Sequence, residues 1–241
     1  MNQEAIICIP GPWANRSEFL RAIITQKPAG EFMFAGGILA HPAGKDHVPL
    51  EFCDPYPEMQ EAFRIAGQGR LSAETLEAIG RHAGIAYLHF PIHVLEQRDR
   101  LAKFTAVIQR AGGIALKIES SGVAHEWARW FSLLSGSTFD VYCSIVTLIG
   151  DSEFYFSCGM HHFNLPECSL PRSFDVREAA DLMNRFNMYQ IIEQPRLASG
   201  HTFSLTADSP VFQLDLLQDT RHEEEDLFHN PNGIWLLSPI E

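Results

Sequence analysis

The sequence lacks the features that anchor or cross-link many small proteins. No apolar run approaches the roughly 18 residues that cross a bilayer, and the opening MNQEAIICIPGPW has no basic region that would begin a secretory signal. The five cysteines are widely spaced and include no Cys-x-x-Cys pair. These absences predict a soluble cytoplasmic protein with reduced, mostly buried thiols.

Basic residues and nucleotide-binding motifs are also scarce. Lys and Arg number 18 against 30 Asp and Glu, which gives a formal net charge of -12. Such a charge repels nucleic acid phosphates and anionic membranes and favours basic macromolecules, although it often serves solubility alone. The pairs Gly36-Gly37 and Gly112-Gly113 lack the spacing of dinucleotide or P-loop motifs and are predicted to be turns. We expect no cofactor, no metal and no nucleic acid or membrane partner.

Helical and strand-like segments alternate along the 241 residues. Short apolar and β-branched runs predict strands at residues 4–10, 31–40, 48–54, 85–92, 114–120, 140–150, 153–160, 202–206, 211–217 and 233–237. Helical spacing and caps, among them Asn15 and Ser72, predict helices at about residues 15–24, 57–67, 72–83, 94–111, 124–134 and 176–192.

Hairpins recur among these elements, and no strictly repeating βα unit is present. The clearest hairpin pairs residues 140–150 with 153–160 through the Gly150-Asp151 turn. This order favours an α+β fold with mixed or antiparallel sheets. We expect two ferredoxin-like halves of split β-α-β type, an N-terminal half at 1–84 and a C-terminal half at 85–241, tightly packed as one body.

Cys158, His161 and His162 lie together and could bind zinc through a thiolate and imidazoles. Structural zinc needs four ligands, usually in two spaced pairs, and the second pair is missing. A buried cysteine followed by hydrogen-bonded histidines at a strand end is therefore the preferred interpretation.

A second group lies at a predicted strand-to-helix turn. Glu119, Ser120, Ser121 and His125 include the residue types of a nucleophile and its base. The Gly-x-Ser-x-Gly frame is absent, and a serine before a helix is more often an N-cap. His201 has no evident partner and is interpreted as structural.

The segment DTRHEEEDLFHNPNGIW, residues 219–235, is dense in acids that only Arg221 opposes. Calcium could use these carboxylates with Asn230 and Asn232, but the EF-hand spacing is missing. A solvated charge run is the usual explanation, whereas aromatic anchors rimmed by charge are typical of an interface. The expected partner-binding residues are Asp219, Glu223, Glu224, Glu225, Asp226, Phe228 and Trp235.

Several phrases over nearly the whole chain resemble a proteobacterial protein family; they are IICIPGPW, KIESSGVAHEWARW, SCGMHHFNLP, GHTFS and DLFHNPNGIW. That family includes immunity proteins encoded beside type VI secretion toxins, in particular the inhibitor of a nuclease effector. The resemblance implies a cytoplasmic antitoxin that binds a secreted toxin, and it supplies no catalytic residues.

The leading hypothesis is therefore an immunity protein whose acidic surface binds a toxin with a basic surface, such as a nuclease effector. The alternative is a small hydrolase or metal-dependent enzyme, if its candidate residues converge in the fold. Those residues are Glu119, His125, Cys158, His161, His162 and His201. A structural adaptor in a larger complex is a third possibility.

Overall fold

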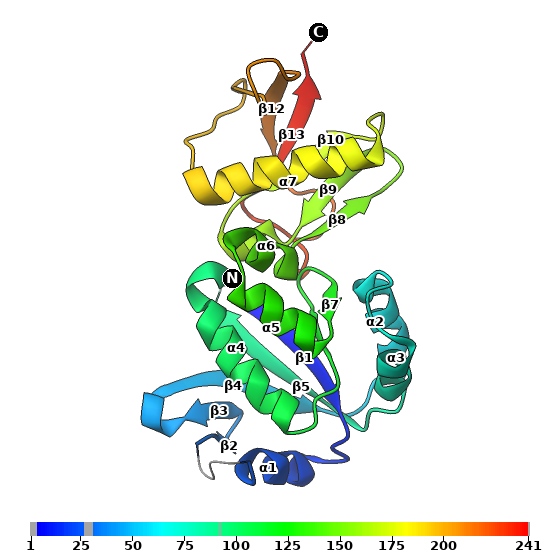
Figure 1. Cartoon of the computed structure of the whole chain (residues 1–241), viewed down its shortest axis with the longest axis vertical. Coiled ribbons are helices and arrows are strands. Elements are labelled where there is room, and N and C mark those ends of the chain that lie inside the picture. Colours follow the sequence, from blue (N-terminus) through cyan, green and yellow to red (C-terminus); the bar gives the residue numbers. More distant parts are fainter. Residues whose placement is uncertain (1–3, 27–30, 92, 241) are drawn as a thin grey trace. The chain divides into compact units, whose positions relative to one another are not determined.

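The computed structural model describes residues 4–26, 31–91 and 93–240, which form an α+β protein (Figure 1). The sequence-based expectations for residues 1–3 and Ile92 lie outside this range. Two compact units follow one another along the chain, unit 1 (Met1–Ser144) and unit 2 (Ile145–Glu241). In the described part of the chain, no helix has both the length and the apolar character to cross a bilayer.

The boundary between the units follows Ser144 and does not lie near residue 84, where we expected it. β5 (Gly84–Pro91) pairs along its whole length with β1 (Glu4–Gly11). A cut at residue 84 would therefore separate neighbouring strands of one sheet. The order of elements in the sequence does not show which strands pair, and this pairing decides the boundary.

Unit 1 contains an antiparallel sheet of the order β2-β3-β4-β5-β1-β6-β7. Its other strands are β2 (Met33–Ala35), β3 (Ile38–His41), β4 (Asp46–Cys53), β6 (Leu116–Ile118) and β7 (Val123–His125). Its helices are α1 (Arg16–Ile24), η1 (Pro42–Gly44), α2 (Met59–Gly67), α3 (Ala73–Gly80), α4 (Val94–Arg110), α5 (Trp127–Ser135) and α6 (Thr138–Ile145), which ends at the boundary. Because β5 and β6 both pair antiparallel with β1, α4 forms a split β-α-β crossover between them.

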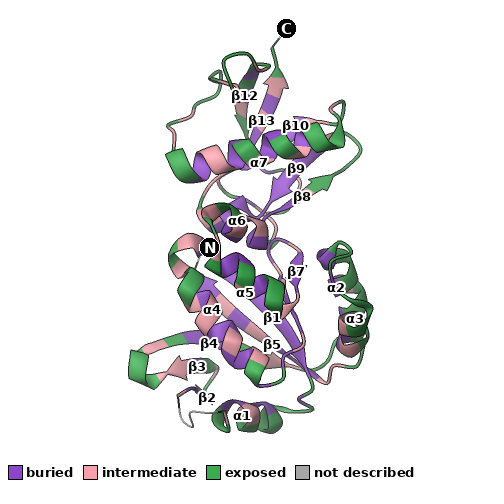
Figure 2. Ribbon diagram, in the orientation of Figure 1, coloured by how far each residue is buried: buried purple, intermediate pink, exposed green. Residues whose placement is uncertain are grey.

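The inner strand β1, which lies between β5 and β6, is buried on both faces (Figure 2). Cys8 packs with Met59 and Phe63 of α2. Ile7 and Ile9 point to the opposite face, on which Phe90 of β5 contacts Phe104 of α4 with 6.4 Å between ring centroids. Two covered faces explain why β1 is a continuous apolar run rather than an alternating one.

Capping side chains place the starts of α1 and α3 where the sequence predicted them. Asn15 Oδ1 accepts the Glu18 N–H at 3.0 Å, and Glu18 Oε2 accepts the Ala14 N–H at 2.9 Å. Ser72 Oγ accepts the Thr75 N–H at 3.2 Å. These side chains satisfy amides that have no partner within the helix.

The strand expected at residues 140–150 is wrong in its first half, which belongs to α6. Asp140 Oδ2 accepts the Ser137 N–H at 2.8 Å, and Ser137 Oγ accepts the Asp140 N–H at 3.3 Å. This reciprocal cap starts a helix and outweighs the strand preference of the apolar run that follows. The expected hairpin is shorter and joins β8 (Thr147–Gly150) to β9 (Phe154–Cys158).

Unit 2 contains a mixed sheet of the order β11-β12-β13-β10-β9-β8, in which β10 and β13 are parallel. Its remaining elements are η2 (Met160–Phe163), β10 (Glu167–Pro171), α7 (Val176–Glu193), β11 (Thr202–Phe203), β12 (Phe212–Leu217) and β13 (Ile234–Pro239). The order of this sheet differs from that of unit 1, so two ferredoxin-like halves are not confirmed.

The two faces of the unit 2 sheet are covered in different ways. α7 packs on one face, where Cys168, Leu214 and Trp235 form the core with Phe186 of that helix. On the opposite face, Arg221 of the loop 218–233, which joins β12 to β13, packs over the rings of Phe154 and Phe156 of β9. The fold thus brings a charged loop against a sheet.

Candidate functional site

The loop 218–233 carries most of the residues expected at an interface. Glu223, Glu224, Glu225 and Asp226 are exposed in succession, and Phe228 is half-buried. We call residues 223–226 the acidic segment. Turns hold its ends, because the Asp226 N–H donates to Glu223 O at 2.9 Å and the Phe228 N–H donates to Asp226 Oδ1 at 2.9 Å.

Asp219 lies at the start of this loop, is only 7% exposed and hydrogen-bonds residues near both ends of the loop. Its Oδ1 accepts the Arg221 N–H at 3.1 Å, and its Oδ2 accepts the Asn230 N–H at 3.0 Å. His222 Nδ1 lies 3.4 Å from the same Oδ2. Asp219 was expected to face a partner, but its carboxylate instead joins the two ends of the loop.

Glu167 anchors the closed loop to the sheet. The residue is 3% exposed, and its carboxylate accepts hydrogen bonds from Ser157 Oγ at 2.6 Å and from the Gly159 and Met160 amides at 3.0 and 2.8 Å. Asn230 Nδ2 donates to Glu167 Oε1 at 3.0 Å. Burying a carboxylate is costly unless donors satisfy it, and these donors come from β9, η2 and the loop.

Trp235 does not lie at the surface as the interface prediction required. Its side chain is 4% exposed and packs in the core under α7. The neighbouring Ile234 and Leu236 point to the opposite face, since side chains alternate along a strand. Both faces are apolar here, so the sequence did not show which face Trp235 would take.

The residues of the enzyme hypothesis fall into separate places. Glu119 and His125 belong to unit 1, where Glu119 Oε2 forms an ion pair with Lys117 Nζ at 2.8 Å. His125 Nε2 donates to the Ser144 carbonyl at 2.9 Å, and Ser120 and Ser121 are buried.

The remaining candidates, Cys158, His161, His162 and His201, belong to unit 2. The rings of His161 and His162 are buried with centroids 4.1 Å apart, whereas His201 is exposed. Burial raises the pKa of the Cys158 thiol and lowers the pKa of His162. All five cysteines are free thiols. A thiol with a raised pKa holds little reactive thiolate.

Acid pH is expected to destabilise unit 1 through His125. The pKa of this imidazole is lowered to about 4, mainly by burial and to a lesser extent by the charges of Arg70 and Arg129, while the hydrogen bond to the Ser144 carbonyl opposes them. Between about pH 6.5 and pH 4 the unfolded chain therefore binds the proton more tightly, so stability falls as pH falls. The free energy of unfolding should drop by about 2 kcal/mol from pH 7 to pH 5 because of this residue. Urea denaturation should show a smaller drop for His125→Gln; an equal drop in both proteins would contradict the assignment.

Sequence reasoning missed the residues that hold the loop in place. Glu167 and Asn230 are polar residues without a motif, and the hydrogen bond between them joins segments that lie far apart in the sequence. Arg221 did give a signal, because it is the only base within the acidic run.

Neither a metal group nor a relative identifies the site. Among residues 4–26, 31–91 and 93–240, no three His, Cys, Asp or Glu side chains are grouped so that they could hold a metal ion. No family model matches the chain, and no curated protein or solved structure matches it.

Proposed function

We propose that this chain is a cytoplasmic inhibitor that binds a protein with a basic surface through the acidic segment. The observation that supports this proposal is the exposure of Glu223, Glu224, Glu225 and Asp226 on a loop closed by Asp219. Charge on a loop that is already ordered speeds the encounter with a basic surface and reduces the ordering cost of binding.

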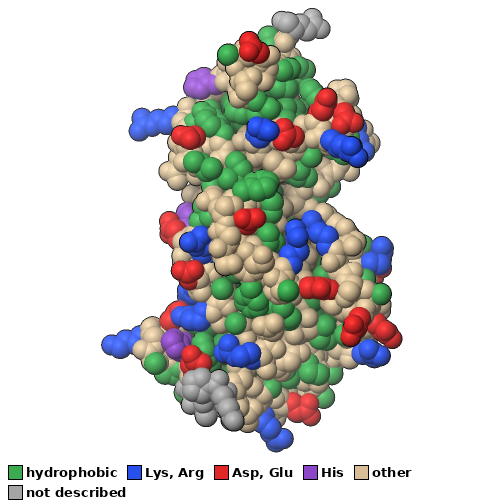
Figure 3. Space-filling view, viewed as in Figure 1, with side chains coloured by type: hydrophobic (Ala, Val, Ile, Leu, Met, Phe, Trp, Pro, Cys, Tyr) green, Lys and Arg blue, Asp and Glu red, His purple; other side chains and the backbone are tan. Residues whose placement is uncertain are grey.

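One face of the molecule offers a contrast. Acidic and basic side chains are interspersed on the face drawn in Figure 3. The acidic segment instead concentrates one sign of charge, beside Leu227, which is 47% exposed, and the half-buried Phe228. Apolar contacts next to charges are what an interface needs to exclude water.

On the basis of the family that the sequence resembles, we propose that the partner is a secreted nuclease toxin. The chain would then be an immunity protein that inhibits this toxin. A nuclease presents cationic side chains to nucleic acid phosphates. Carboxylates on the acidic segment would cover those cations and block the substrate.

Charge reversal tests this proposal. The triple variant Glu223→Lys, Glu224→Lys and Glu225→Lys should weaken binding to the product of the neighbouring open reading frame by about tenfold or more at low salt, and less at high salt. Asp226 is left intact because it bonds to the Phe228 amide. Titration calorimetry at several salt concentrations measures both effects.

The matched control reverses three exposed acids outside the loop, Glu58, Glu74 and Glu193. It changes net charge equally and should retain affinity. Equal weakening by both variants, or none by the first, would contradict the assignment. Elemental analysis addresses the alternative, because stoichiometric zinc in the purified protein would favour a metal-dependent enzyme.

A further inference from the structure

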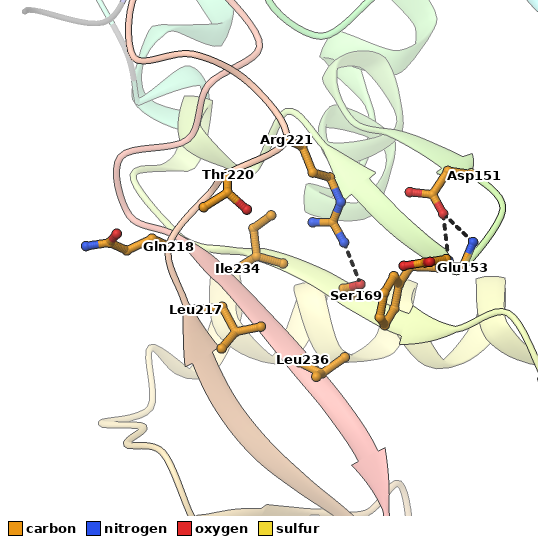
Figure 4. A pocket seen from close by; sticks show the side chains of 10 residues that line it. Asp151, Glu153, Ser169, Leu217, Gln218, Thr220, Arg221, Ile234 and Leu236 are labelled. Carbon is orange, nitrogen blue, oxygen red and sulfur yellow. Dashed lines mark hydrogen bonds between the residues drawn. The ribbon is translucent and has the colours of Figure 1, made fainter.

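A pocket of about 320 Å³ opens on the face of the unit 2 sheet opposite α7 (Figure 4). Its lining comes from the β8–β9 turn, from β9, β10, β12 and β13, and from the loop 218–233. This volume suits a small molecule or the end of a peptide chain.

Arg221 brings a positioned positive charge into the pocket. Its Nη2 donates to Ser169 Oγ at 3.2 Å, and its guanidinium carbon lies 4.5 Å from the centroid of the Phe156 ring. The Ser169 hydroxyl, 1% exposed, donates to Tyr155 O at 3.2 Å and therefore meets Arg221 as an acceptor. Stacking and this hydrogen bond orient the guanidinium before any ligand arrives.

Most of the donors on this guanidinium remain available to a ligand. A guanidinium carries several more N–H groups than the one bond to Ser169 uses. Among the described residues, no Asp or Glu forms an ion pair with Arg221. The nearby Asp151 Oδ1 is engaged by the Glu153 and Phe154 amides, both at 2.7 Å. Asp151 and Arg221 interact only through space, without a hydrogen bond. The half-buried guanidinium of Arg221 therefore keeps N–H groups that can donate two parallel hydrogen bonds to a carboxylate.

Apolar side chains surround the rest of the pocket. Leu217, Ile234 and Leu236 come from the paired strands β12 and β13. In Figure 4 they lie below Arg221, with Ile234 nearest to it. Leu217 is 48% exposed, and a ligand with a hydrocarbon stem would cover it.

The rim limits how much negative charge a ligand can carry. Asp151 and Glu153 line the pocket as well. They repel a multiply charged anion such as phosphate more strongly than a single carboxylate. Among the residues that the structure describes, Arg221 is the one cation that lines the pocket.

We propose that this pocket binds a carboxylate that carries a short apolar stem. Arg221 pairs with the carboxylate, while Leu217, Ile234 and Leu236 contact the stem. Either a small organic acid or the C-terminus of a peptide offers this chemistry. The inference does not depend on the acidic segment contacting a partner.

Hexanoate is the first probe, titrated into the full chain and followed by amide chemical shifts in NMR spectra. Saturable shifts should appear around Arg221 and Ser169, and neutral hexanamide should bind about tenfold or more weakly. Arg221→Gln should weaken hexanoate binding about 10- to 100-fold. The affinity of Arg221→Lys should lie between those of the native protein and the glutamine variant. Glu153→Gln should strengthen binding about two- to fivefold, because it removes a like charge.

A second pair of probes separates the two sources of the carboxylate. The tripeptide Gly-Gly-Leu is compared with its C-terminal amide. Binding of hexanoate alone supports a small acid, and binding of the free peptide alone supports a chain terminus. No saturable binding of either carboxylate, equal binding of hexanamide, or tighter binding of inorganic phosphate overturns the proposal. Should Arg221→Gln fail to fold, an unchanged hexanoate affinity in Arg221→Lys and Glu153→Gln overturns it equally.

Discussion

Trp235→Ala is expected to lower the free energy of unfolding of unit 2 by about 3–5 kcal/mol. The side chain is 4% exposed and packs with the residues under α7, so truncation loses apolar burial and leaves a cavity. Hydrogen exchange resolved along the chain measures this loss, because amides of β10 and β13 should exchange faster.

Phe228→Ala provides the contrast to Trp235→Ala. Phe228 is half-buried in the loop, with its ring centroid 5.7 Å from that of His222, so its loss should cost about 1 kcal/mol or less. If the interface assignment is right, Phe228→Ala should weaken binding to the partner and Trp235→Ala should not do so directly. A Trp235→Ala protein that keeps its stability but loses the partner would restore Trp235 as an interface residue.

Glu167→Leu is expected to destabilise unit 2 by a similar amount, about 3–5 kcal/mol. It leaves the Gly159 and Met160 amides and the Asn230 side chain without the acceptor that now binds them. Buried donors without an acceptor cost their full desolvation energy. The loop 218–233 should also lose its anchor, so its amides should exchange faster than in the native protein.

Glu167→Gln is the matched variant, because its amide oxygen can still accept from those three donors. Only the Ser157 hydroxyl, 2.6 Å from Oε2, must then find another acceptor. A cost of about 1–2 kcal/mol is expected in urea denaturation. Equal stability of the leucine and glutamine variants would show that the hydrogen bonds to Glu167 do not hold the loop.

Sequence patterns were most informative where the cause of a structure lies within one turn. Asn15 and Ser72 cap helices through amides only three residues away. Ser137 and Asp140 form the same kind of local cap. This cap was not considered in the sequence-based prediction, and the apolar run after it led to the expectation of a strand where α6 lies.

The candidate site could be predicted only in part. The acidic segment was predicted to be at the surface, and its four residues are exposed. Asp219 belongs to the same run of charge but is buried, because Asn230 and Arg221 donate to it. Composition does not show which carboxylate of a segment is buried and which is exposed, because this depends on whether the fold brings hydrogen-bond donors to it.

The sequence by itself determined the α+β class, the helix caps and the exposed acidic segment, because each depends on periodicity or on near neighbours. Only the tertiary structure decided the boundary after Ser144, the core position of Trp235 and the pairing of Arg221 with Ser169. Those features depend on strand partners and faces chosen between segments far apart in the chain. A local sequence pattern does not indicate which strands pair or which face a side chain takes.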